Sequence, residues 1–376
     1  MAELALRSWV EVSRSRLAAN FRAVRELVGP DVEVMPVVKA DAYRHGAAEV
    51  SRLLEAEGAR WLAVSSVEEG AALRDAGVRA QILVMAGVLP GERAALLEYR
   101  LTPAVHRLED IAALGRLAAA RGAPVAYHLK IDTGLGRLGT RADAASIVAA
   151  VRRTRGARLE GLMTHFASAA FYDSGQTEEQ IARFEHVRAA LAAEGISPRY
   201  RHLAATIPIA YGRREAWGNM VRPGHAIYGY VSPARGPAPL RRLEVKPVLS
   251  WKAAVLQIKD VPAGTPIGYG AMFRAERPMR VAVLAAGYAD GVPHRLSNRG
   301  HVIAAGRKVP IIGAISMDLT TIDATQCPEL RPGDSVLLIG EENGVTIDAQ
   351  EIARAAGTIS YAILCNISVR VRRVYV

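Results

Sequence analysis

The sequence predicts an α/β protein in which a (β/α)8 barrel of the TIM type is followed by a mostly β domain. From about residue 10 to 230, short apolar runs alternate about eight times with alanine-rich amphipathic stretches, as expected for parallel strands alternating with helices. Beyond residue 242, short alternating strands separated by turn signals replace this rhythm. The length of 376 residues also exceeds what one hydrophobic core usually organises, so two domains are expected.

The expected barrel strands are apolar runs near 33–38, 61–65, 81–86, 102–105, 125–131, 159–164, 199–205 and 221–228. Helical patterns intervene, for example at 67–75 and 176–194. An open, doubly wound parallel sheet has the same alternation, so periodicity alone leaves it as an alternative.

Proline and glycine interrupt every pattern in the stretch VSPARGPAPLRR at 231–242, which we interpret as a linker. The runs SWKAAVLQI, MRVAVLAAGY, GHVIAAGRKVPI and GDSVLLIG then predict strands. We therefore expect a barrel at 1–232 and a β-domain at 240–376. The first strand, at about 7–12, could pack with the barrel or with the carboxy-terminal domain.

Composition argues against several classes of protein. The net charge is +11, but the arginines are scattered along predicted helices and not gathered into runs with aromatic residues, so no nucleic-acid partner is expected. Cys327 and Cys365 form neither a CxxC pair nor a zinc spacing, so we expect no metal site and a reducing compartment. Glu3 and the lack of a sustained apolar run argue against a signal peptide or a membrane helix. A cytoplasmic location follows.

Lys39 is the most informative single residue. Only six of the 48 basic residues are lysines, and Lys39 lies in VVKADAYRHG, at the end of an apolar strand run. Unlike arginine, lysine can lose its proton and act as a nucleophile or base. The competing interpretation is a solvated lysine at a strand-to-helix turn. The carboxyl end of a barrel strand, however, is where such barrels place their chemistry.

Polar residues recur at the carboxyl ends of the other predicted barrel strands, and their repetition at one face predicts a single site. They are Lys39 and Tyr43, then Lys130, Asp132 and Arg137, then His165, His202, Thr206, Arg222 and Gly224.

The order of eight motifs resembles that of bacterial alanine racemases, which depend on pyridoxal 5′-phosphate and have fold type III. The motifs are VVKADAYRHG, HLKIDTGLGRLG, THFASA, NMVRPGHAIYG, IGYGAMF, GYADG, ISMD and ISYAILCNISVRVRRVYV. The resemblance implies a barrel, a carboxy-terminal β-domain and a head-to-tail homodimer. It also implies interconversion of L-alanine and D-alanine, supplying D-alanine for peptidoglycan.

The resemblance implies two catalytic bases. Lys39 forms the internal aldimine and then acts as one base, because a desolvated amine has a pKa lowered towards neutrality. Tyr269, in IGYGAMF of the partner subunit, is the second base, although without the resemblance it would be taken for an ordinary strand tyrosine. Arg222 matches the arginine that faces the pyridine nitrogen and leaves it unprotonated, which disfavours decarboxylation and transamination.

The resemblance also assigns residues to the cofactor phosphate. Tyr43, Thr206 and Tyr361 would hold it together with the backbone N–H groups of Gly224 and His225. Pro223 has no N–H group and cannot contribute. His165 and His202 match residues that link Arg222 towards Tyr269.

Three further positions follow from the resemblance. Arg137 matches the residue near the phenolic oxygen of the cofactor and the substrate carboxylate. Lys130 matches a lysine that many members carry carbamylated, and the alternative is an unmodified lysine paired with Asp132. Met317, beside Ser316 in ISMD, matches a substrate-binding residue that reaches the site across the subunit interface. Asp318 could equally cap a turn.

The chain departs from the family pattern at several positions. Arg44 replaces a glycine, and Ala205-Thr206 replaces an asparagine-serine pair. At the expected entrance, Ala170 and Ala314 replace an aspartate and an arginine, and His294 replaces another arginine. These changes leave open a broader racemase that also accepts serine or larger amino acids. A non-catalytic barrel that binds the same cofactor is the alternative from another class, but such proteins lack the second domain and an equivalent of Tyr269.

Overall fold

The computed structural model describes residues 6–376 and divides the chain into two compact units. We call residues 17–42 and 47–246 the barrel unit, and residues 6–16, 43–46 and 247–376 the β-unit. Glu3, on which the signal-peptide argument rests in part, lies outside the described residues. Among the described residues no helix is both long and apolar enough to cross a membrane.

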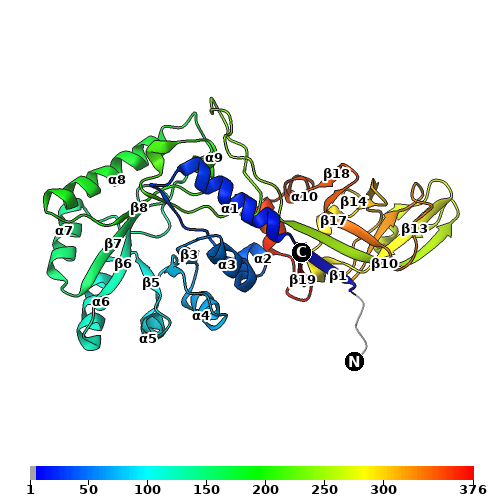
Figure 1. Cartoon of the computed structure of the whole chain (residues 1–376). Coiled ribbons are helices and arrows are strands. Elements are labelled where there is room, and N and C mark those ends of the chain that lie inside the picture. Colours follow the sequence, from blue (N-terminus) through cyan, green and yellow to red (C-terminus); the bar gives the residue numbers. More distant parts are fainter. Residues whose placement is uncertain (1–5) are drawn as a thin grey trace. The chain divides into compact units, whose positions relative to one another are not determined.

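The barrel unit is built on a curved sheet of parallel strands (Figure 1), which backbone hydrogen bonds to a further strand pair close into a ring. Six of them form one sheet in the order β3–β4–β5–β6–β7–β8. The strand β2 (Glu33–Val34) pairs with β9 (Met220–Val221), and this pair joins both edges of the sheet. On one side Val38 N donates to Ala63 O (2.8 Å), and on the other Arg222 N donates to Ala204 O (3.0 Å). The expected (β/α)8 barrel is confirmed, and the open sheet is not formed.

The six sheet strands are β3 (Trp61–Val64), β4 (Gln81–Val84), β5 (Thr102–Val105), β6 (Val125–Lys130), β7 (Ala157–Met163) and β8 (Tyr200–His202). The expected strand at 221–228 is wrong beyond Val221. After Pro223, which has no N–H to donate, the chain turns, and Ile227 N donates to Gly224 O (3.0 Å). The expected run at 33–38 is likewise a short strand followed by a single bridge from Val37 to Ala63.

Helices alternate with these strands and bury one face each. In α6 (Leu108–Arg121), Ile111, Leu114 and Ala118 are buried at spacings of three and four residues. Ser66 caps α4 (Val67–Asp75) through Glu69 N. The other helices of this part of the chain are α1 (Arg14–Val28), α2 (Lys39–Arg44), α3 (Ala47–Ala56), η1 (Pro90–Glu92), α5 (Arg93–Glu98), α7 (Ala144–Arg153), α8 (Gln176–Ala193), α9 (Thr206–Ala210) and η2 (Arg214–Ala216).

The β-unit is organised around the long strand β10 (Leu249–Val261), which pairs antiparallel with three other strands. These partners are β1 (Ser8–Val12), β13 (Met279–Leu284) and β17 (Ser335–Glu342). The first strand of the chain, β1, also pairs in parallel with the last, β19 (Arg372–Tyr375). Both ends of the described chain therefore belong to the sheet system of the β-unit.

The remaining elements of the β-unit are β11 (Pro266–Ile267), η3 (Tyr269–Ala271), β12 (Phe273–Arg274), η4 (Tyr288–Asp290), η5 (His294–Leu296), β14 (His301–Ala304), β15 (Arg307–Pro310), β16 (Thr320–Asp323), β18 (Val345–Ile347), α10 (Ala349–Ala356) and α11 (Ser360–Cys365). Four of the runs expected to be strands, in SWKAAVLQI, MRVAVLAAGY, GHVIAAGRKVPI and GDSVLLIG, coincide with β10, β13, β14–β15 and β17.

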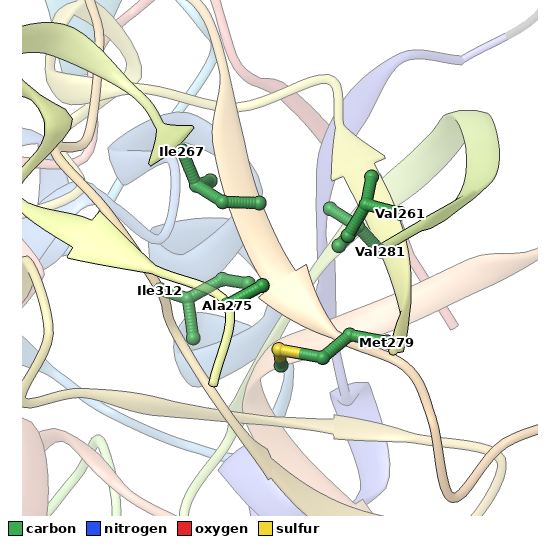
Figure 2. Packing of buried hydrophobic residues seen from close by; sticks show 6 residues of the cluster. All are labelled: Val261, Ile267, Ala275, Met279, Val281 and Ile312. Atoms are coloured by element: carbon green, nitrogen blue, oxygen red, sulfur yellow. The ribbon is translucent and has the colours of Figure 1, made fainter. Parts of the chain in front are cut away.

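A compact apolar cluster anchors the hairpin β11–β12 (Figure 2). Its buried members are Val261, Ile267, Ala275, Met279, Val281 and Ile312, and Phe273 packs against them. Figure 2 shows these side chains grouped together from separate segments of the β-unit. Because Ile267 and Phe273 flank residues 268–272, the cluster fixes both ends of the turn that carries Tyr269.

Candidate functional site

Four basic side chains come together in the barrel unit, and we call Lys39, Lys130, Arg137 and Arg222 the cationic cluster. Burial and the charges of Arg222, Arg137 and Lys39 lower the pKa of Lys130 to about 8, although Asp132 opposes this. Burial and the charges of all four residues lower the pKa of His165 to about 3. The structure therefore brings together side chains that the sequence placed on four different strand ends, and their surplus positive charge suits an anionic ligand.

Arg222 follows β9 and is 3 % exposed. Its guanidinium donates to three backbone carbonyls, those of Thr164 (2.7 Å), His202 (2.6 Å) and Leu203 (3.0 Å). It also contacts His202 Nδ1 (2.9 Å) and His165 Nδ1 (3.4 Å). Burial lowers the pKa of Arg222 to about 9, but this is still above neutrality, so the group remains a fixed cation whose orientation is set by the barrel backbone.

The contact between Arg222 and His202 fixes the protons of two buried histidines. Arg222 can only donate, so His202 Nδ1 must accept and the ring proton lies on Nε2. His202 Nε2 is 2.8 Å from His128 Nδ1, which must accept in turn, so His128 carries its proton on Nε2. That nitrogen is buried and has no hydrogen-bond partner among residues 6–376. The carboxylate of Glu160, itself paired with Arg158, lies 4.0 Å away.

Residues around Thr206, at the start of α9, form a small buried polar cluster. The Thr206 hydroxyl oxygen accepts from Gly224 N (3.3 Å) and Ala226 N (3.2 Å), and Thr206 is 4 % exposed. His225, between these two residues, is buried, and its ring stacks on Tyr230. Backbone N–H groups that converge beside a hydroxyl are the donor set that binds a phosphate.

Lys39 begins the short helix α2, whose backbone is left-handed. Ala40, Asp41, Ala42, Tyr43 and Arg44 have φ angles of 53°, 53°, 53°, 54° and 65°. This conformation costs an L-residue about 1–2 kcal/mol, so five in succession mark a segment that its surroundings hold in place.

Lys130, at the end of β6, is only 5 % exposed. Within the described chain no carboxylate lies within ion-pair distance of its amine. Asp132, its expected partner as an unmodified lysine, instead accepts from the backbone N–H groups of Gly134, Leu135 and Gly136 at 3.0–3.1 Å. Burial raises the pKa of Asp132, but these bonds and Arg141 outweigh it and lower the pKa overall. The expected pair of Lys130 with Asp132 does not form.

Two of the expected phosphate ligands lie in the β-unit. Tyr43 and Tyr361, on α11, have ring centroids 6.0 Å apart. Burial, with smaller contributions from Tyr361 and Cys365, raises the pKa of Tyr43 above its usual value, so its hydroxyl keeps its proton. Arg44 Nε donates to Cys365 O (3.3 Å), and Arg44 O accepts from Arg373 Nε (3.0 Å). These bonds support an arginine in a conformation that favours glycine.

Tyr269 lies on an exposed turn of the β-unit between two glycines with positive φ, Gly268 (76°) and Gly270 (65°). Its side chain is 76 % exposed. Ala314 lies beside this turn, since a Cβ on Gly268 would be 2.9 Å from Ala314 N. Met317 is 54 % exposed.

The other expected entrance and interface residues take separate places. Asp318 forms an ion pair with Arg370, and Arg370 also pairs with the buried Asp290. Asp318 therefore does more than cap a turn. Ala170 O, in the barrel unit, accepts from Arg235 N (2.7 Å) in the linker. The ring of His294, in the β-unit, meets that of Tyr288 edge-on.

Sequence reasoning missed two residues of this region. His128 precedes Lys130 by two residues on β6, so the alternation of strand side chains places both on one face and could have identified it. Glu69, on α4, accepts from the backbone N–H of Ala40, the residue after Lys39. Its only sequence signal is the pattern Ser66-x-x-Glu69, which predicts a helix start and not a contact with Lys39.

Comparison with known proteins covers nearly the whole chain. Residues 12–233 match the family model for the alanine racemase N-terminal domain, and residues 248–375 match that for the C-terminal domain. Alanine racemase of Halothermothrix orenii is 42% identical over 369 residues, covering 98% of this chain and 96% of the relative. That of Carboxydothermus hydrogenoformans is 40% identical, covering 98% and 99%.

Solved structures give the same result. The alanine racemase of Streptomyces lavendulae superposes with a TM-score of 0.91 at 32% identity, covering 100% of this chain and 98% of that one. The Bartonella henselae enzyme, solved with covalently bound pyridoxal phosphate, superposes with a TM-score of 0.86 at 27% identity, covering 98% and 99%. Because both domain models match and the relatives align from end to end, the chain belongs to the alanine racemase family.

Proposed function

We propose that the protein is an alanine racemase that uses pyridoxal 5′-phosphate to interconvert L-alanine and D-alanine. The observation that carries the proposal is the cationic cluster around Lys39 at the carboxyl ends of the barrel strands, in a chain of this family. When bound, pyridoxal phosphate supplies an electron sink that acidifies the α-proton of an amino acid.

The residues of the barrel unit fit this cofactor. The polar cluster of Thr206, Gly224 and Ala226 contains a hydroxyl and backbone N–H groups, which are the donors that a phosphate needs. The cationic cluster would compensate the negative charge of the phosphate and of the phenolic oxygen, and Arg137 would suit the substrate carboxylate. Arg222 offers only donors and keeps its proton, so a ring nitrogen that faces it stays unprotonated. Lys39 would hold the cofactor covalently and exchange a proton at the substrate α-carbon.

Racemisation needs a second base on the opposite face of the substrate, and we assign this role to Tyr269 of a second copy of the chain. Tyr269 is carried on a turn between two glycines and is 76 % exposed, as expected for a residue that another molecule covers. Met317, exposed in the same unit, would approach the same substrate. The functional form would then be a homodimer.

We further propose that Lys130 is carbamylated. A buried ammonium beside three other cations is unfavourable, and the lowered pKa of Lys130, about 8, favours the neutral amine that reacts with carbon dioxide. The carbamate anion would compensate the charge of Arg137. D-alanine made in the cytoplasm would supply peptidoglycan synthesis.

The proposal is tested by Lys39→Ala, with the exposed Lys259→Ala as control. The Lys39 variant should lose both the visible absorbance of the bound cofactor and racemisation of L-alanine, measured by chiral chromatography, because it lacks the attachment point and one base. Lys259→Ala should retain both. Near-normal turnover by Lys39→Ala would show that the central assignment is wrong.

A further inference from the structure

The backbone that presents Lys39 is held in an unfavourable conformation. Residues 40–44 are all non-glycine residues with positive φ. Within the barrel unit, Ala42 N donates to Val38 O (2.9 Å). Asp41 Oδ1 accepts from Ala47 N (2.7 Å) at the far end of the turn. A left-handed segment persists only where surrounding contacts determine it, so a contact at the Ala40 peptide, next to Lys39, bears directly on how Lys39 is held.

That contact is made by Glu69, a half-buried residue in the first turn of α4. One carboxylate oxygen, Oε1, accepts from Ala40 N (2.7 Å), and the other, Oε2, accepts from Ser65 N (2.6 Å). Ala40 N belongs to the peptide bond that follows Lys39, and Ser65 follows β3, the strand bridged to the Lys39 segment through Val37 and Ala63. One side chain thus ties the start of the left-handed segment to the neighbouring strand end.

We propose that Glu69 is a positioning residue for Lys39. It acts through the Ala40 peptide, fixing the backbone at the point where the chain becomes left-handed and thereby the direction of the Lys39 side chain. A carboxylate is required because both partners are N–H donors and each takes one oxygen. A glutamine offers only one acceptor oxygen and turns an N–H donor towards the other peptide. The catalytic part of this inference rests on the proposed function of Lys39.

Glu55 provides a matched control. Its Oε1 also accepts from two backbone N–H groups, those of Arg79 (2.9 Å) and Ala80 (2.6 Å), in the same unit but away from Lys39. Glu55→Ala therefore removes the same kind and number of bonds as Glu69→Ala. Any effect that follows from a general loss of stability should appear in both variants.

The first measurement is hydrogen exchange of the full-length protein without cofactor. Glu69→Ala should lose protection at the Ala40 amide and in the segment 39–44, whereas Glu55→Ala should change exchange only around 79–80. If the alanine variant does not fold, Glu69→Gln provides the same test. It should lose exchange protection at one of the two amides that Glu69 binds, those of Ala40 and Ser65. Unchanged exchange at both Ala40 and Ser65 in the glutamine and alanine variants would overturn the proposal.

The second measurement is the affinity of these proteins for pyridoxal 5′-phosphate, together with the fraction attached to Lys39 after borohydride reduction. Hydrogen bonds to a charged group are strong enough that Glu69→Ala should weaken binding and lower kcat by about tenfold to hundredfold. The KM for alanine should change much less. If Glu55→Ala loses as much cofactor affinity and kcat as Glu69→Ala, the effect comes from a general loss of stability, and the positioning role of Glu69 is wrong. If the wild-type protein binds cofactor but does not racemise alanine, the proposed function is wrong. The hydrogen-exchange measurement would still test whether Glu69 holds the backbone after Lys39.

Discussion

At the scale of single residues, the fixed charge of Arg222 determines the state of the histidines behind it. The chain of contacts from Arg222 through His202 to His128 requires both rings to be neutral and to carry their protons on Nε2. Protonation of either ring would place two donors face to face beside a buried guanidinium. Burial and the charges of Arg222 and Arg158 accordingly lower the pKa of His128 to about 3.

This state predicts a loss of stability in acid. A histidine with a pKa of about 3 when folded and about 6.5 when unfolded binds fewer protons in the folded state between these values. The free energy of unfolding therefore falls as pH drops below about 6.5, by up to about 1.4 kcal/mol per pH unit for each such histidine. His128→Asn should make this dependence shallower between pH 7 and 5 in chemical denaturation of the full chain. The control His186→Asn, at an exposed histidine, should leave this pH dependence unchanged. If His128→Asn also leaves the slope of unfolding free energy against pH unchanged, His128 is protonated in the folded state.

Lys130 gives a second residue-scale prediction. Its pKa of about 8, against 10.5 for a free side chain, means that the charged amine destabilises the fold by about 3 kcal/mol below pH 8. This cost is relieved as pH rises from 8 to 10.5, or by conversion to a carbamate at neutral pH. Protein prepared in ¹³C-bicarbonate should show a carbamate resonance that Lys130→Ala abolishes and Lys259→Ala retains. A resonance that survives Lys130→Ala would place the modification elsewhere.

At the scale of elements, two short turns carry the groups assigned to catalysis, and both have unusual backbones. The left-handed segment 40–44 follows Lys39, and Gly268 and Gly270 enclose Tyr269. The apolar cluster around Ile267 fixes the hairpin beneath the second turn (Figure 2). Each side chain therefore extends from a backbone segment whose conformation is determined by contacts with neighbouring residues.

Gly268→Ala tests the Tyr269 turn. Gly268 has φ of 76°, and a Cβ there would lie 2.9 Å from Ala314 N, so the turn must shift. Gly264→Ala is the matched control, because Gly264 has φ of 85° but no atom within 4 Å of the added Cβ. Both variants should lose about 1 kcal/mol of stability, but only Gly268→Ala should lower alanine racemisation strongly while cofactor absorbance persists. Equal activities would show that the position of this turn does not limit the reaction.

At the scale of the whole molecule, the β-unit exposes several large apolar side chains, among them Tyr269, Met272, Met317 and Ile359 at 76, 54, 54 and 63 %. Exposed side chains of this kind are typical of surfaces that another molecule covers. This observation supports the homodimer proposed above, in which each β-unit completes the site of the other copy.

The shared site predicts complementation. Lys39→Ala and Tyr269→Phe should each be inactive or severely impaired as homodimers. After subunit exchange, a heterodimer would contain one site with both wild-type residues and one with neither, so activity should reappear on mixing. Mixing either variant with itself is the control. No recovery in a heterodimer confirmed by native mass spectrometry would mean that each site is completed within one chain.

The sequence by itself determined the fold class, the order of the elements and the family. Apolar periodicity located α4 and α8 to within a residue, because amphipathic spacing is a local property of the chain. It overextended the last barrel strand, since the turn after Pro223 is fixed by bonds within 224–230 that carry no periodic signal. The polar strand ends also predicted Lys130, Arg137, His165 and Arg222, which the structure brings together with Lys39.

Only the tertiary structure decided the contacts that give these residues their chemical state. The proton positions on His202 and His128, the burial of Lys130 among other cations, and the link from Glu69 to Ala40 all depend on residues from different elements. The left-handed conformation of residues 40–44 could likewise not be predicted from local sequence, because alanine, tyrosine and arginine each disfavour positive φ angles. Local sequence sets periodicity and propensity, whereas hydrogen bonds between distant residues, desolvation and backbone strain arise only when the chain has folded.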